Sequence, residues 1–414
     1  MVDNGLLPPA TSRRHCAEPD QTTQRLDRAL ASAEEDRPLR IALLAPPWRP
    51  VTPTSDGAVE AALASLADAL VAAGHDVTLY AAPGSRSLAR IVSVLDRAHE
   101  REVGSSMVEA DHAACAFAAI ERAELDGMPF DLVHDHSGWT ALAMADRLAV
   151  PVVHTVHRPF DEATRDWYRA HGAKAALVCL SRAHAAAGPA GVRVDAVVPN
   201  PVEVVSAAKD DFLLWVGRIA PGTGADRAIR VARAAGRPLV LAGAVEREAE
   251  AYFSEAIAPH VEGPQVTHVS DLGGARKREL LRRARAILMP TMWVEPFGMT
   301  MVEAMAAGTP VIAAPRGSAL EVIDDGRTGV FVNDEAELAA ALDRVDAIDL
   351  DRCRARAEER FGPKAVAQRY AAVYRAIARP LPGAGAPVPA GWRLRSARCS
   401  RAASWRRPRP CARH

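Results

Sequence analysis

The stretch RPLRIALLAPPW (Arg37–Trp48), with the segment that follows it, decides the fold class of this chain. Its apolar run IALLA is short and ends at Pro46, which predicts a strand that leads into a loop. The next segment carries a helical apolar stripe and then VTLYA (Val77–Ala81), a second strand; the stripe is Val59, Leu63, Leu66 and Leu70. A strand, a helix and a strand with short links form a parallel βαβ unit, so the sequence predicts an α/β fold.

The ends of this first helix carry their own signals. Thr54, Ser55 and Asp56 precede the apolar stripe, and their side-chain oxygens are expected to cap the helix N-terminus. Gly74 follows the last apolar position and is expected to end the helix.

The same alternation continues along the chain and predicts two consecutive doubly wound parallel-sheet domains that face a cleft. Further strands of the first series are expected at 130–136, 151–157, 176–181 and 196–200. A second series of strands is expected at 211–218, 237–243, 265–270, 286–290, 310–314 and 328–332, with helices at 225–235, 277–284 and 363–378. We therefore divide the chain into a flexible leader (1–37), a first domain (38–199), a second domain (200–380) and a disordered arginine-rich tail (381–414).

Composition excludes several classes of protein. The sequence shows no run of about 18 apolar residues and no signal-peptide h-region, so neither a membrane span nor secretion is predicted. The six cysteines are scattered and form no C-x-x-C pair. Together these features favour a soluble protein of the reducing cytoplasm. Residues 381–414 hold eight arginines and no acid, so the rest of the neutral chain carries a charge of −8. An acidic body does not favour a nucleic-acid partner. The tail leaves peripheral membrane contact open, although a solvated extension is the simpler interpretation.

The stretch WVEPFGMTMVEAMAAGTP (Trp293–Pro310) keeps two acids in an apolar setting. Glu295 is expected in a loop after a strand, and Glu303 within the following helix, whose N-terminal amides belong to Gly298, Met299 and Thr300. Carboxylates beside such a loop can accept hydrogen bonds from a neutral polyol. The alternative is that both acids only complement the helix dipole.

The stretch GRIAPGTG (Gly217–Gly224) follows another predicted strand. Arg218 is placed to bind a phosphate with two hydrogen bonds. No G-K-[ST] follows, so this is not a P-loop, and the glycine spacing does not match the dinucleotide fingerprint. The glycine pair Gly222 and Gly224 by itself indicates no more than a turn.

Histidines cluster near two strands of the first domain. His134 and His136 are expected on one strand face, a spacing that could hold a metal, but no carboxylate or cysteine motif completes the site. His154 and His157 fall on opposite faces, His154 within the sheet and His157 at the strand end beside the cleft. No nucleophile elbow and no H-E-x-x-H motif is present, so no metal site is predicted.

The segment EPFGMTMVEAMAAGTPVIA (Glu295–Ala313) resembles the Glu–seven residues–Glu signature of retaining glycosyltransferases of family four, which share the GT-B fold. Pro296–Gly298 and Gly308–Pro310 stand in register with that signature. GRIAP, RPLVLAG, RGSALEVIDDGRTGVFV and FDLVHDHSG also look like family segments in family order. The resemblance covers residues 39–378.

The resemblance implies transfer of a sugar, with retention and without a metal or other cofactor, from a nucleotide-sugar donor that is most often UDP- or GDP-linked. The acceptor would be the hydroxyl of a small molecule, lipid or glycan. The last predicted helix would cross back onto the first domain.

The resemblance also assigns residues. Glu303 would hold the ribose hydroxyls, and Glu295 would face the donor sugar near the reacting centre. The amides after Phe297, those of Gly298, Met299 and Thr300, would meet sugar hydroxyls. From the rest of the cleft, three further residues are implied: Arg218 at the diphosphate, His157 near the 6-position of the sugar and Gly57 beside the phosphates.

The chain departs from the family pattern at four places. Thr223 stands where the family usually has a lysine that pairs with the donor phosphates, and Ala58, Arg158 and Pro201 stand where glycine is common. We hypothesise that Arg158 supplies the missing charge; the alternative is an exposed arginine without a ligand. These departures keep open a degenerate protein that binds a nucleotide sugar or a partner without turnover. A sugar-nucleotide epimerase or hydrolase would need a cluster of acids in the first domain, which is not found.

Overall fold

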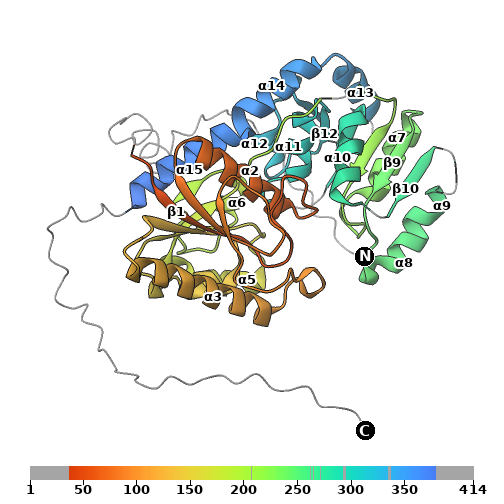
Figure 1. The fold of residues 1–414 in the computed structure, drawn as a ribbon. Coiled ribbons are helices and arrows are strands. Elements are labelled where there is room, and N and C mark those ends of the chain that lie inside the picture. The colour runs from red at the N-terminus through yellow and green to blue at the C-terminus, as the bar shows by residue number, and fades with distance from the viewer. Residues whose placement is uncertain are drawn as a thin grey trace, which may run out of the picture. The chain divides into compact units, whose positions relative to one another are not determined.

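The computed structural model describes residues 37–378 except 207, 262, 264, 271, 292–294 and 334–336. The predicted tail, and the predicted leader apart from residue 37, lie outside the described residues. Two parallel sheets with helices around them form one compact unit, which confirms the predicted fold class (Figure 1). The predicted domain boundary at residues 199 and 200 stays a prediction; it falls between the last strand of one sheet and the first of the other.

The first sheet has seven parallel strands in the order β3-β2-β1-β4-β5-β6-β7. The strands are β1 (Arg40–Leu44), β2 (Asp76–Tyr80), β3 (Arg90–Val92), β4 (Leu132–Asp135), β5 (Val152–Thr155), β6 (Ala176–Cys179) and β7 (Ala196–Val197). The chain order reverses between β1 and β4, which pair with Leu44 opposite Asp135. In such sheets ligands bind beyond the carboxyl ends of the strands at this reversal.

The second sheet repeats this arrangement with six strands in the order β10-β9-β8-β11-β12-β13. The strands are β8 (Leu213–Val216), β9 (Leu239–Ala242), β10 (Val266–Val269), β11 (Ala286–Met289), β12 (Val311–Ala313) and β13 (Gly329–Phe331). Here the order reverses between β8 and β11. The loops after β1, β4, β8 and β11 are therefore the expected ligand loops.

The helices of the first series are α2 (Ala58–Ala72), α3 (Ser106–Leu125), α4 (Trp139–Ala143), α5 (Glu162–His171) and α6 (Arg182–Ala186). Those of the second are α7 (Ala225–Ala234), α8 (Glu250–Tyr252), α9 (Ala258–Val261), α10 (Gly274–Arg283), α11 (Met299–Ala306), α12 (Ala319–Val322), α13 (Leu338–Asp346), α14 (Leu350–Phe361) and α15 (Pro363–Ile377). Short 3₁₀ turns (Glu100–Glu102, Ala145–Arg147, Gly172–Lys174, Arg247–Ala249) and one π-helical turn (Phe253–Ile257) connect them. Within the described ranges, no helix combines the length and apolarity that a bilayer crossing requires.

The predicted capping of α2 is right at one end and wrong at the other. Gly74 follows the helix with φ of +90°, a conformation that favours glycine. The N-cap residue is Gly57, and no side-chain oxygen caps the helix. The predicted oxygens are used elsewhere, because Ser55 accepts from the Gly57 amide and Asp56 accepts from the amide of Gly274 in the second domain.

The last helix, α15, packs against α2 and joins the core of the first sheet. Val366, Tyr370 and Tyr374 are buried there with Leu63 and Leu66 of α2. The chain therefore begins and ends its described part in the same core, although the second sheet lies between these segments in the sequence (Figure 1).

Candidate functional site

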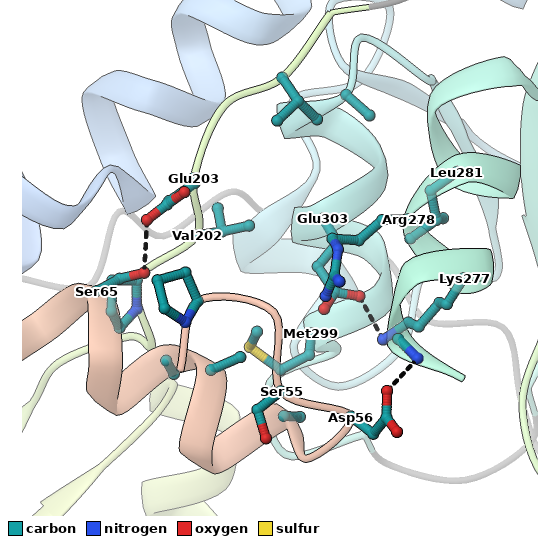
Figure 2. Close-up of a pocket in the computed structure, with 18 residues that line it drawn as sticks. Ser55, Asp56, Ser65, Val202, Glu203, Lys277, Arg278, Leu281, Met299 and Glu303 are labelled. Carbon is teal, nitrogen blue, oxygen red and sulfur yellow. Dashed lines mark hydrogen bonds and ion pairs between the residues drawn. The ribbon is translucent and has the colours of Figure 1, made fainter. Parts of the chain in front are cut away.

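A cavity of about 120 Å³ lies between the face of α2 and the helices α10 and α11 (Figure 2). The first domain lines it with the loop before α2 and with small residues of α2, of which Ala58 is the first. The second domain contributes Lys277, Arg278 and Glu303, and the connection between the domains contributes Pro201 and Glu203. A concave site with a few convergent charged groups at a domain junction is the usual setting for a ligand.

Glu303 faces this cavity and meets Lys277 of α10. The Lys277 Nζ atom lies 2.5 Å from Glu303 Oε2, and each side chain is 21% exposed. The pair is close but poorly aligned, since Oε2 forms no hydrogen bond of good geometry with the described residues. A carboxylate held in this way keeps the capacity to accept hydrogen bonds from a ligand.

The N-terminus of α10 is closed by the first domain. The Asp56 carboxylate accepts from the Gly274 amide, where a negative charge also complements the helix dipole. Arg278 donates to the carbonyl oxygen of Thr54 at 3.3 Å. A Cβ atom at Gly274 would lie 2.8 Å from Asp56 Oδ1, so this contact depends on glycine.

The loop before α11 is fixed from several sides. Gly298 has φ of +75° and begins the helix without a side-chain cap, and the amides of Met299 and Thr300 have no hydrogen-bond partner among the described residues. Phe297 is buried edge-on against Phe361, with ring centroids 5.8 Å apart. These constraints leave a pre-organised set of amide donors at a helix N-terminus.

The first domain also anchors this loop. Ser181 Oγ donates to the carbonyl oxygen of Pro296 at 2.5 Å. Close by, the Glu321 carboxylate accepts from the amides of Arg182 and Ala183 at 2.8 and 2.6 Å, at the start of α6. Both contacts join the two domains beside Glu295.

Glu295 is a partly buried carboxyl whose surroundings oppose its charge. Burial raises its pKa above the usual range, and the nearby guanidinium of Arg218 acts in the opposite direction. Arg218 is exposed and forms an ion pair with Glu246. Glu295 and Arg218 are therefore close enough for their charges to interact.

Thr223 lies in a tight turn and not in an open phosphate cradle. Its hydroxyl donates to the carbonyl oxygen of Ala220 at 2.7 Å, which stabilises the turn. Gly224 has φ of +94°, and a Cβ atom there would lie 2.7 Å from the carbonyl oxygen of Pro290. The glycine therefore does more than form a turn, because it lets the loops after β8 and β11 approach each other.

Gly57 is buried at the start of α2 beneath the side chain of Glu60. A Cβ atom at Gly57 would overlap the Glu60 carboxylate, which is itself buried and has its pKa raised by that burial. Ala58, which stands where the family usually has glycine, is exposed and lines the main cavity.

The histidines separate into two groups. His154 is buried in the sheet, as predicted, with its Nδ1 atom 2.6 Å from Asp135 Oδ2. His136 Nδ1 lies 2.8 Å from His157 Nε2, and its Nε2 atom lies 3.2 Å from His134 Nδ1. Among the described residues, no group of three histidine, cysteine or acidic side chains is placed to hold a metal.

Arg158, proposed from the sequence as a substitute cation, is exposed and lies over the ring of Trp139, with its guanidinium carbon 6.0 Å from the ring centroid. Its carbonyl oxygen lies 3.0 Å from His184 Nε2. Neither contact gives Arg158 a partner in the main cavity.

The structure brings some predicted residues together and leaves others apart. Glu303 and Met299 line the main cavity, whereas His157 lines a smaller neighbouring one that shares Pro201 with it. Sequence reasoning missed Lys277 and Arg278, and it assigned Asp56 to a helix cap and not to this site. A signal for Lys277 was present, since it lies four residues before the buried Leu281 and thus on the buried face of α10.

Comparison with known proteins finds two matching family models. A model of "Glycosyl transferases group 1" matches residues 200–364, and a model of "Glycosyltransferase Family 4" matches residues 59–205. Together they cover about three quarters of the chain. Each model describes a glycosyltransferase domain, one in each half of the chain.

Several curated relatives of this chain are named D-inositol 3-phosphate glycosyltransferase. That of Mycobacterium avium is 28% identical over 53% of this chain and 62% of its own length. That of Mycobacteroides abscessus is 28% identical over 72% of this chain and 79% of its own length. This chain spans only about three fifths of the length of the Mycobacterium avium protein and of two similar relatives.

Solved structures show the same fold. AviGT4, a glycosyltransferase involved in avilamycin A biosynthesis, is 28% identical with a TM-score of 0.60, over 82% of this chain and 98% of its own. The sucrose-phosphate synthase of Thermosynechococcus elongatus has a TM-score of 0.64 at 21% identity, with the same coverage, and shows the fold alone.

Proposed function

We propose that this chain transfers a glycosyl group from a nucleotide-sugar donor to an acceptor hydroxyl, with retention of the anomeric configuration and without a metal ion. The observation that carries the proposal is the segment around the start of α11. It places two carboxylates, Glu295 and Glu303, on either side of the free amides of Met299 and Thr300. Carboxylates and amides together match the hydroxyl groups of a polyol, which both donates and accepts.

In this proposal Glu303 accepts hydrogen bonds from the ribose hydroxyls in the main cavity, which requires Lys277 to release it. The amides of Gly298, Met299 and Thr300 bind hydroxyls of the donor sugar, and Glu295 lies near the reacting carbon. Arg218 and Gly57 approach the diphosphate. UDP- or GDP-linked sugars are the donors to expect, and no cofactor is required.

The reaction breaks the bond between the anomeric carbon and the phosphate oxygen and forms a bond from that carbon to the acceptor oxygen. Departure and attack on the same face preserve the configuration. The acceptor proton passes to the leaving phosphate, so no side-chain base is assigned. Arg218 and the N-terminal amides of α11 stabilise the charge that develops on the diphosphate.

The comparisons support the donor class without fixing the donor. A structure of Anabaena HepE, which shares the fold at 18% identity, holds UDP-glucose. The curated relatives are named for D-inositol 3-phosphate, so a polyol phosphate is the first acceptor to test.

A degenerate protein that binds without turnover is the second candidate. The observation in its favour is Thr223, whose hydroxyl is already bonded to Ala220 where the family usually has the phosphate-binding lysine. This candidate predicts weak nucleotide binding and no product.

A thermal-shift panel with UDP, GDP, ADP, CMP and dTDP, alone and with their common sugars, tests the donor site. A ligand at a hundred times its dissociation constant stabilises the fold by about 2.7 kcal/mol. The best donor is then incubated with D-inositol 3-phosphate, with and without EDTA, and the product anomer is determined by NMR. Product formation that EDTA does not change, with the donor's configuration retained, supports the proposal. Binding without product favours the degenerate protein, and donor hydrolysis without acceptor favours a hydrolase.

A further inference from the structure

A row of hydrogen-bonded side chains connects the last helix to His157. Tyr374 of α15 is fully buried, and its hydroxyl oxygen lies 2.6 Å from His134 Nδ1. His136 Nε2 lies 3.2 Å from the same His134 atom, and His136 Nδ1 lies 2.8 Å from His157 Nε2. His134 Nε2 completes the arrangement at 2.8 Å from Thr155 Oγ1. The row thus joins residues that are up to 240 positions apart in the chain.

The three histidines are neutral at physiological pH. Burial is the main cause that lowers the pKa of each ring, to about 3 for His157 and well below the usual value for His134 and His136. A neutral imidazole carries one N–H and one bare nitrogen. Each contact in the row therefore fixes which nitrogen of the neighbouring ring holds the proton.

The direction of the row follows from Tyr374. Its buried hydroxyl has no hydrogen-bond partner among the described residues other than His134, and a buried hydroxyl that does not donate is destabilising. Tyr374 therefore donates to His134 Nδ1. Two bare nitrogens 3.2 Å apart would repel each other, so His136 Nε2 carries a proton that shares the His134 Nδ1 lone pair with Tyr374. The bare Nδ1 of His136 then accepts from His157 Nε2.

This direction leaves His157 Nδ1 bare. That atom is buried and has no hydrogen-bond partner among the described residues. His157 and His136 line a narrow cavity, too small for a water molecule, together with Asn200, and this cavity borders the main one at Ala62 and Pro201. A bare ring nitrogen accepts a hydrogen bond, so it suits a hydroxyl and does not suit a phosphate or carboxylate oxygen.

We propose that His136 and His134, fixed by the Tyr374 hydroxyl, are positioning residues that hold His157 with its Nδ1 lone pair available to a hydroxyl of the donor sugar. The sugar-binding half of this inference rests on the proposed function, whereas the tautomer does not. Helix α15 thereby influences the tautomer of His157 through the Tyr374 hydroxyl, in addition to packing against the first domain.

The tautomer is measured on the full chain labelled with ¹⁵N-histidine, by long-range ¹H–¹⁵N correlation. His157 is assigned from the signal that disappears in His157→Gln. We expect an unprotonated Nδ1 and a protonated Nε2 in the wild type. A protonated Nδ1 overturns the proposal.

Two variants break the row and two matched variants keep it. Tyr374→Phe and His136→Leu should move His157 to the other tautomer or to a mixture of both. Tyr252→Phe removes a hydroxyl that donates to Asp226 in the second domain, outside the row, and should leave the His157 signals unchanged. His136→Asn offers an amide oxygen near the Nδ1 position and should restore the wild-type tautomer. An unchanged His157 in Tyr374→Phe, with the fold confirmed by circular dichroism, overturns the proposal.

Kinetics with UDP-glucose as the probe donor test the ligand half. Loss of one neutral hydrogen bond predicts a roughly two- to tenfold fall in kcat for Tyr374→Phe, with UDP affinity unchanged. A changed tautomer with an unchanged kcat overturns the ligand half. If the wild type binds UDP-glucose but turns nothing over, the proposed function fails, and the dissociation constants of UDP-glucose and UDP replace kcat in the same comparison. If it does not bind UDP-glucose either, the ligand half fails as well, while the NMR result still decides the tautomer.

Discussion

Replacing Thr223 with lysine should strengthen nucleotide binding if the loop after β8 meets the donor phosphates. The wild-type hydroxyl forms one hydrogen bond, to the carbonyl oxygen of Ala220 at 2.7 Å. Its loss lowers the stability of the turn by about 1 kcal/mol. A lysine gains a charge-assisted contact with the diphosphate of about 1.5–3 kcal/mol, or roughly ten- to hundredfold in affinity. Since residue 223 is only partly buried, solvent screening favours the lower end, about tenfold.

Isothermal titration with UDP and GDP measures this effect, and Thr223→Met is the matched control. Methionine removes the same hydroxyl and adds a similar length without a charge. The gain in affinity of Thr223→Lys over Thr223→Met should shrink as the salt concentration rises from about 0.05 M to about 0.5 M, because added ions screen a partly exposed charge. If lysine binds neither nucleotide more tightly than methionine does, position 223 does not contact the phosphates and the reasoning is refuted.

Three further predictions concern the same site. Glu303→Gln should weaken binding of the best nucleotide roughly tenfold or more, because a charged hydrogen-bond acceptor is lost. The control Glu279→Gln, at an exposed ion pair on α10, should leave the affinity unchanged. Equal affinities of the two variants in calorimetry would show that Glu303 is not in the site. Gly298→Ala should lower the free energy of unfolding by about 1–2 kcal/mol, because φ at this position is +75°. It should also weaken nucleotide binding, because the added Cβ atom overlaps Met301. The control Gly74→Ala, at φ of +90° with open space around it, should lower the free energy of unfolding in urea without changing nucleotide binding. Burial lowers the folded pKa of His157 to about 3, so between its ordinary value of about 6.5 and pH 3 only the unfolded chain binds this proton. As the pH is lowered across this window, the free energy of unfolding should therefore decrease by up to about 1.4 kcal/mol per pH unit for this residue. His157→Gln should flatten the dependence of that free energy on pH, measured by urea unfolding. An unchanged pH dependence contradicts a buried neutral ring.

Local pattern was enough to predict most of the fold. Each expected strand run overlaps an observed strand, and the helices predicted at 225–235 and 363–378 end within one residue of α7 and α15. Burial in a doubly wound sheet imposes a period that the sequence has to keep, so it can be read without the structure. The strand β3 and the helix α3 were not predicted. The apolar stripe of α3 was present, but alanine dominates it, with Ala113 and Ala116 beside Phe117 and Ile120.

The candidate site was predicted in its loops but not in its contacts. The sequence placed Glu295, Gly298 and Glu303 around one helix N-terminus, where the structure has them. The partner of Glu303 is Lys277, which comes from a different helix. The cap expected from Asp56 was wrong because that carboxylate bonds to Gly274, 218 positions away.

The sequence by itself determined the alternation of strands and helices, the glycine that follows α2 and the acids beside α11, because each depends on neighbours a few positions away. Only the tertiary structure decided that α10 brings Lys277 to Glu303 and that Tyr374 reaches His134. The physical reason is that periodic burial is a local property of the chain. The pairing of buried polar groups depends instead on which elements pack together, and hydrogen-bond geometry then selects the partners.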